Sequence, residues 1–126
     1  MVAIVATALL AVSCSDLPAK TVTVGGETVT VARLVDALAG LCEAAESPAT
    51  ARALFFDRSH EALHTVARGV EEVDRAQAGA LLQAKEKVES ELDARPANLP
   101  DDLRRLAASY RASLGRLAIE APPCDK

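Results

Sequence analysis

The sequence predicts a mainly α-helical domain in which a short N-terminal β-hairpin precedes an antiparallel four-helix bundle. Two alternating β-branched runs flank Gly25-Gly26, and apolar residues then recur every three or four positions along most of the chain. Short connections marked by Pro48, Gly69 and Pro96 separate these segments, which is typical of antiparallel helices. A chain of 126 residues has room for one domain, which we assign to residues 20–126.

The hairpin is expected over residues 20–31. Threonine and valine alternate on both sides of Gly25-Gly26, and a two-residue glycine turn suits the twist of paired strands. A lone two-stranded hairpin is marginally stable in water, so we expect it to pack on the helices that follow.

The first two helices are expected to meet at Ser47-Pro48, with Ser47 as N-cap of the second helix and Gly69 as its stop. The first helix has an apolar series at helical spacing, which consists of Val31, Leu34, Val35, Leu38, Leu41, Cys42 and Ala45. The second helix is expected to bury Phe56, Leu63, Ala67 and Val70.

The third helix is expected to begin with a capping box formed by Asp74 and Gln77. Its predicted buried stripe consists of Leu81, Ala84, Val88 and Leu92, whereas the charged run 85–91 is interpreted as a solvated face with i,i+4 ion pairs. The fourth helix is expected to open at Pro100-Asp101-Asp102, where acidic side chains favour the positive end of the helix dipole.

Residues 1–13 form an uncharged apolar run that is too short to span a bilayer, which needs about 20 residues. Leu10-Ala11-Val12-Ser13-Cys14 follows at its end, and polar residues come next. This segment resembles the lipobox signal peptide of bacterial lipoproteins. The resemblance implies that residues 1–13 are removed, that Cys14 is lipidated and that residues 14–19 are a tether at the extracytoplasmic face of the cell membrane. The alternative is a buried apolar strand in which Cys14 is an ordinary thiol.

The other two cysteines are Cys42 and Cys124, an even pair in a chain that the resemblance places in an oxidising compartment. We expect a disulfide between them, with Ile119–Cys124 running back along the first helix. Two buried free thiols are the alternative.

The net charge is −4, and acidic and basic residues are interspersed along the predicted helices. Nucleic-acid binders normally carry a basic patch, so we expect no nucleic-acid partner. The expected partners are the membrane, through the lipid anchor, and a protein of the cell envelope. No cofactor fingerprint is recognised.

One group of side chains suggests chemistry. Asp57, His60 and His64 share one face of the second predicted helix, and Glu71 joins them if that helix continues. Imidazole suits zinc, copper, iron and nickel, so these residues are candidate ligands for a divalent metal. The more ordinary interpretation is that His60 lies at the edge of the core, hydrogen-bonded to a carboxylate.

Residues 60–64 also match the pattern H-E-x-x-H of zinc hydrolases, in which both histidines bind zinc and the glutamate is the general base. The chain has no third histidine, so the third zinc ligand would have to be Glu71, Glu72 or Asp74. These carboxylates lie only seven to ten residues beyond His64, closer than the third ligand of such enzymes usually lies. We therefore expect no enzymatic activity. The sequence favours a lipid-anchored helical domain with an interaction or ligand-binding role. Metal binding at His60 and His64 is the first alternative, and an H-E-x-x-H metallohydrolase is the second.

Overall fold

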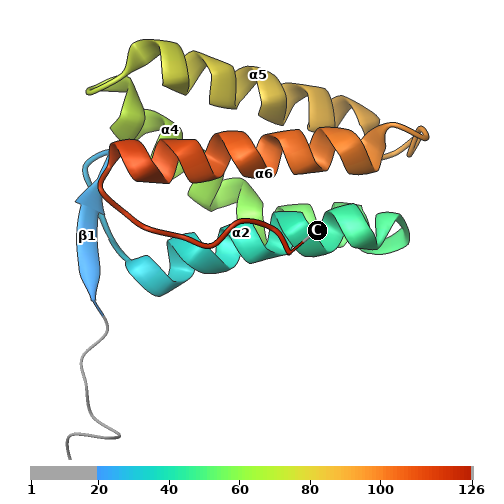
Figure 1. The fold of residues 1–126 in the computed structure, drawn as a ribbon, viewed down its shortest axis with the longest axis horizontal. Helices are drawn as coiled ribbons and strands as arrows, with labels where there is room; N and C mark the ends of the chain where they lie inside the picture. Colours follow the sequence, from blue (N-terminus) through green and yellow to red (C-terminus); the bar gives the residue numbers. More distant parts are fainter. Residues whose placement is uncertain (1–19, 126) are drawn as a thin grey trace, which may run out of the picture.

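The computed structural model of this protein describes residues 20–125, and it is mainly helical with an N-terminal antiparallel hairpin (Figure 1). This coarse prediction is confirmed. The predicted signal peptide, Cys14 and the tether 14–19 lie outside the described residues. The elements are β1 (Thr21–Val24), β2 (Glu27–Thr30), α2 (Val31–Glu46), the 3-10 turn η1 (Pro48–Thr50), α3 (Ala51–Leu54), the π-helical turn η2 (Phe55–Ser59), α4 (His60–Glu71), α5 (Arg75–Glu91) and α6 (Leu99–Arg116).

The hairpin pairs Thr21 with Thr30 and Val24 with Glu27. Its turn residues, Gly25 and Gly26, have φ values of 57° and 80°, a left-handed conformation that glycine adopts without strain.

Gly69, which the sequence predicted as a helix stop, lies inside α4, and that prediction is wrong. The hairpin lies so close to Gly69 that a Cβ atom there would be 2.6 Å from Cγ1 of Val24. This glycine therefore leaves room for the hairpin, and α4 continues to Glu71.

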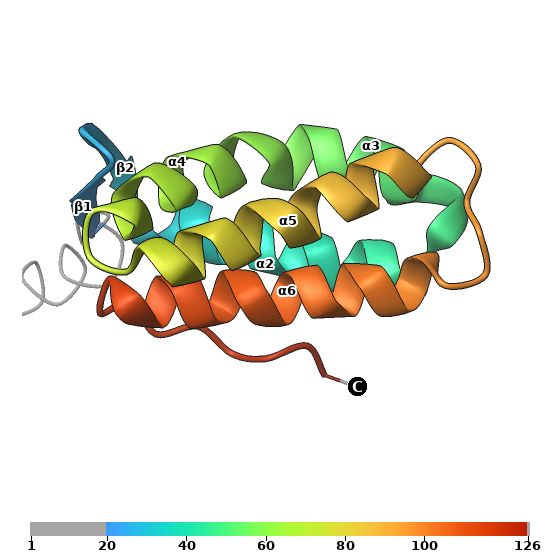
Figure 2. The same cartoon turned by 90° about the horizontal axis from the view of Figure 1, so that it is seen from above.

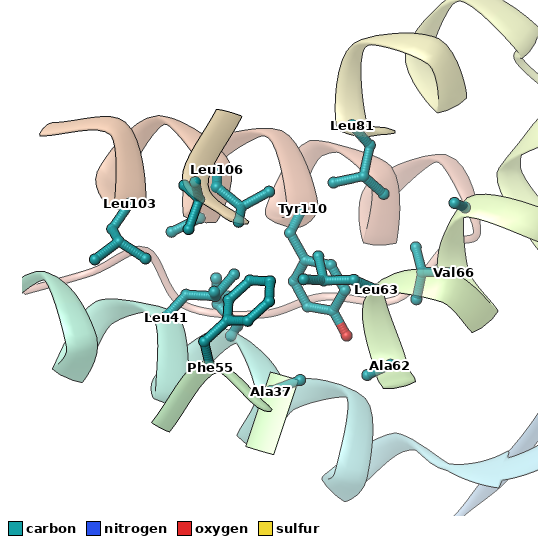
Figure 3. Close-up of a cluster of buried hydrophobic side chains, with 14 of the residues drawn as sticks. Ala37, Leu41, Phe55, Ala62, Leu63, Val66, Leu81, Leu103, Leu106 and Tyr110 are labelled. Carbon is teal, nitrogen blue, oxygen red and sulfur yellow. The ribbon is translucent and has the colours of Figure 1, made fainter. Parts of the chain in front are cut away.

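The helices contact one another in the pairs α2 with α6, α4 with α5, and α5 with α6 (Figures 1 and 2). Leucine and alanine fill most of the core, and Tyr110 is its largest side chain (Figure 3). The Tyr110 hydroxyl donates a hydrogen bond of 2.8 Å to the carbonyl oxygen of Leu34. Burial raises the pKa of Tyr110 well above its ordinary value, so the hydroxyl stays a donor.

The second helical segment contains a π-helical turn that shifts which side chains face the core. In η2 the backbone N–H of His60 donates to the carbonyl oxygen of Phe55, an i→i+5 bond that takes one more residue than an α-helical turn. Phe55 is therefore fully buried, whereas Phe56 is 40% exposed. The expectation that Phe56 is buried is wrong by one residue, because it assumed regular α-helical spacing.

The π-helical turn packs tightly on α2 at Gly40. The buried hydroxyl of Ser59 donates a hydrogen bond of 2.8 Å to the carbonyl oxygen of Ala37. Arg58 forms ion pairs with Asp36 and Glu43, which lie on either side of Gly40 in sequence. Hydrogen bonds to these two carboxylates raise the pKa of Arg58.

One of the two hydrogen bonds of the predicted capping box forms at the N-terminus of α5. The Asp74 carboxylate accepts a hydrogen bond of 3.0 Å from the backbone N–H of Gln77, as predicted for an N-cap. The Gln77 side chain donates instead to Ser109 and Ser113 of α6. The residue therefore joins two helices rather than completing the cap.

The C-terminal segment runs back over α2, and Cys124 lies beside Cys42 (Figure 1). Their Cα atoms are 5.4 Å apart and their sulfur atoms are within disulfide-bonding distance. The predicted pairing of the two cysteines is confirmed. This bond closes a loop of 82 residues and ties the end of the chain to its first helix.

Gly40→Ala should destabilise the fold by about 1–3 kcal/mol, because the added Cβ meets Ser59 Oγ at 2.9 Å and Arg58 Cβ at 3.0 Å. Gly79→Ala in α5 is the matched control. No atom lies within 4 Å of its added Cβ, so it should stabilise by about 0.5–1 kcal/mol. Urea denaturation measures both changes, and an equal gain at the two positions would contradict the tight contact at Gly40.

Reduction of the Cys42–Cys124 bond should lower the free energy of unfolding by on the order of 3–5 kcal/mol, because the long closed loop no longer restrains the unfolded chain. Intact mass after alkylation should show adducts on these two residues only after reduction. Alkylation of both thiols without reduction would show that the bond does not form.

Candidate functional site

Both histidines and both phenylalanines of the chain lie together on η2 and α4. The ring centroids of His60 and His64 are 4.7 Å apart, and those of Phe56 and His60 are 5.1 Å apart. The ring of Phe55 lies 5.8 Å from that of His60 on the core side. The apolar rings of Phe55 and Phe56 therefore pack against the imidazole of His60.

Helix α5 supplies two further charged side chains. Nε2 of His60 lies 3.2 Å from Oε2 of Glu89, and Nζ of Lys85 donates a hydrogen bond of 2.9 Å to the same oxygen. We call His60, His64, Lys85 and Glu89 the histidine cluster. A single carboxylate oxygen in it lies between an imidazole and an ammonium.

Burial shapes the charges of this cluster. The Lys85 side chain is only 7% exposed, and a buried ammonium is costly unless a carboxylate pairs with it. Glu89 is that partner. Burial and then the positive charge of Lys85 lower the pKa of His64, so its imidazole is neutral at pH 7.

His60 and His64 also line a cavity of about 360 Å³ between the hairpin, α2 and α4. Two ion pairs lie in its lining: Arg33 with Glu61 at 2.7 Å, and Arg68 with Glu27 at 3.6 Å. These charged side chains are more than half exposed, so the cavity opens to solvent. The remaining lining residues are Val29, Leu34, Ala62 and Thr65.

The predicted ligand set of Asp57, His60, His64 and Glu71 is not assembled. Within residues 20–125, no three His, Cys, Asp or Glu side chains are grouped so as to hold a metal ion. Asp57 lies in the π-helical turn, where the rotation of 100° per residue does not apply. Glu71 is seven residues beyond His64, which is about 10 Å along a helix. Only the two histidines are brought together.

Sequence reasoning missed Lys85 and Glu89, which it assigned to a solvated face. The predicted ion pairs at i,i+4 exist, but Lys85 is buried. Its position was readable from spacing, because Leu81, Lys85, Val88 and Leu92 recur at intervals of four, three and four. The lysine belongs to the buried stripe in place of Ala84.

A second polar cluster lies where α5 connects to α6. The Asn98 amide donates to Glu91 at 2.9 Å and to Asp102 at 2.6 Å, and Lys87 lies within ion-pair distance of both carboxylates. Burial acts to raise the pKa of Asp102, but hydrogen bonds with Glu91 and Asn98 and the charge of Lys87 outweigh it and lower that pKa. These contacts join the end of α5 to the start of α6.

No protein-family model, curated protein sequence or solved structure matches this chain. Across residues 20–125, none of the helices combines the length and the apolar character that crossing a membrane requires.

Proposed function

We propose that this chain is a lipoprotein held at the extracytoplasmic face of the cell membrane through Cys14, and that its helical domain binds a ligand or a protein of the cell envelope. The observation that carries the proposal is the lipobox-like segment Leu10-Ala11-Val12-Ser13-Cys14 after an apolar run. The proximity of Cys42 and Cys124 supports it, because disulfides persist in oxidising compartments. That pair accounts for two of the three cysteines.

The anchor would set the orientation of the domain. Five residues separate Cys14 from Lys20, so the six Cα–Cα steps between them span at most about 20 Å. The hairpin follows directly and lies at one end of the helices (Figure 1). This arrangement would put the hairpin and the neighbouring cavity closer to the membrane than the α5–α6 connection.

The scaffold for this function is, in our proposal, the antiparallel four-helix bundle expected from the sequence. Support comes from the contacts α2–α6, α4–α5 and α5–α6, and from the short connections between successive helices. The segment η1 to α4 would serve as the second helix of the bundle.

A ligand-binding role is supported by the cavity between the hairpin and α4. Its volume of about 360 Å³ lies within the range of small-molecule sites, and polar groups converge in it. The two adjacent imidazoles favour metal binding as a second candidate function.

Lipidation is tested by expressing the full chain in bacteria fed a fatty acid that carries a detectable tag. The wild type should carry the label, fractionate with membranes and run at its mature size, whereas Cys14→Ser should lose the label because the lipobox-like segment then has no thiol to be acylated. Cys42→Ser/Cys124→Ser is the control and should keep the label. A Cys14→Ser chain that still reaches the membrane at mature size, or a wild type without label, overturns the proposal.

A further inference from the structure

We propose that the histidine cluster binds one divalent transition metal ion through His60, His64 and Glu89, and that the Lys85 ammonium competes with the metal for the Glu89 carboxylate. This inference rests on the proposed ligand-binding role and names the ligand. It does not depend on lipidation.

The separation between His60 and Glu89 suits a metal. Zinc bonds to imidazole nitrogen and carboxylate oxygen are about 2.0–2.2 Å long, so two ligand atoms of a tetrahedral site lie roughly 3.4 Å apart. Nε2 of His60 and Oε2 of Glu89 are 3.2 Å apart. An ion could bridge these two atoms without a movement of α4 against α5.

The third ligand comes from the next turn of α4. His60 and His64 are four residues apart on one helix, the spacing with which two imidazoles bind a single zinc in H-E-x-x-H helices. Their ring centroids lie 4.7 Å apart with an interplanar angle of 82°. Since the three side chains do not yet form a converged group, binding requires His64 to rotate toward Glu89.

Lys85 distinguishes this site from a simple pair of histidines. Its ammonium donates 2.9 Å to the same Glu89 oxygen that faces His60. A metal ion that binds this oxygen comes close to a positive charge in a partly dehydrated environment, where Coulomb repulsion is stronger than in water. Lys85 therefore weakens metal binding, and its removal should strengthen it.

The surroundings favour a nitrogen-preferring metal with an open coordination position. Two imidazoles and one carboxylate suit zinc or copper, and copper binds such sites more tightly than zinc. The side chains of His60 and Glu89 are 30% and 28% exposed, so solvent reaches the space between them and water could complete the coordination. Phe55 and Phe56 pack against the His60 ring, with centroids 5.8 and 5.1 Å away.

Calorimetric titration of Zn²⁺ and Cu²⁺ into the full chain, purified without a histidine tag, tests the proposal. The wild type should bind one ion per chain. His64→Ala and Glu89→Gln should each weaken binding at least about tenfold, because each removes a ligand. Lys85→Met should tighten it by about tenfold or more, a gain that misfolding cannot produce.

Asp57→Asn and Glu71→Gln are matched controls and should leave the affinity unchanged. Absence of binding by the wild type, a loss with Asp57→Asn instead of Glu89→Gln, or an unchanged affinity in Lys85→Met each overturns the ligand set proposed here. A lipid-labelled chain that binds neither metal would refute this inference and leave the membrane anchoring intact. A chain that binds metal but carries no lipid label would refute the membrane anchoring and leave this inference intact.

Discussion

The close contact between α2 and the π-helical turn η2 fixes the arrangement of the rest of the molecule. At Gly40 the two backbones approach so closely that the buried Ser59 hydroxyl reaches the carbonyl oxygen of Ala37. Arg58 holds the same turn from outside through Asp36 and Glu43. An i→i+5 hydrogen bond within the turn accommodates one extra residue. This extra residue changes the angle about the helix axis at which the side chains of α3 and η2 project, relative to those of α4.

The rotation decides which aromatic side chains enter the core and which meet the charged side chains of α5. Phe55 belongs to the same buried core as Leu41 and Leu103 (Figure 3). Phe56 remains at the surface, where the Arg52 guanidinium lies 5.0 Å from the centroid of its ring. Because α4 begins at the end of the turn, His60 lies against Glu89 and His64 follows one turn later. The candidate site thus depends both on the backbone geometry of the turn and on the packing of α4 against α5.

Features that depend on short sequence signals could be predicted. Gly25-Gly26 predicted the turn of the hairpin, and Asp74 predicted the cap of α5. The two cysteines outside the lipobox-like segment predicted the pair Cys42–Cys124. Each signal acts within a few residues or by pairing of a rare residue type, so a single sequence is sufficient to read it.

Features that depend on contacts between helices could not be predicted in the same way. The π-helical turn packs against Gly40 of another helix, and the sequence of residues 55–59 contains no signal for it, so Phe56 was expected in the core where Phe55 lies. In the sequence Gly69 has the features of a helix stop, but in the structure it lies within α4, where the hairpin packs directly against it. Half of the candidate site was identified, since His60 and His64 share a helix. Glu89 was missed because its proximity to them is a property of the packed fold.

The most direct test of this account is the scalar coupling across backbone hydrogen bonds, measured by NMR on the labelled chain. We predict a coupling between the amide nitrogen of His60 and the carbonyl carbon of Phe55, the signature of the π-helical turn. A coupling from the His60 amide to the carbonyl of Phe56 instead would mean a regular α-helix. That result would contradict the placement of Phe55 in the core and of His60 beside Glu89.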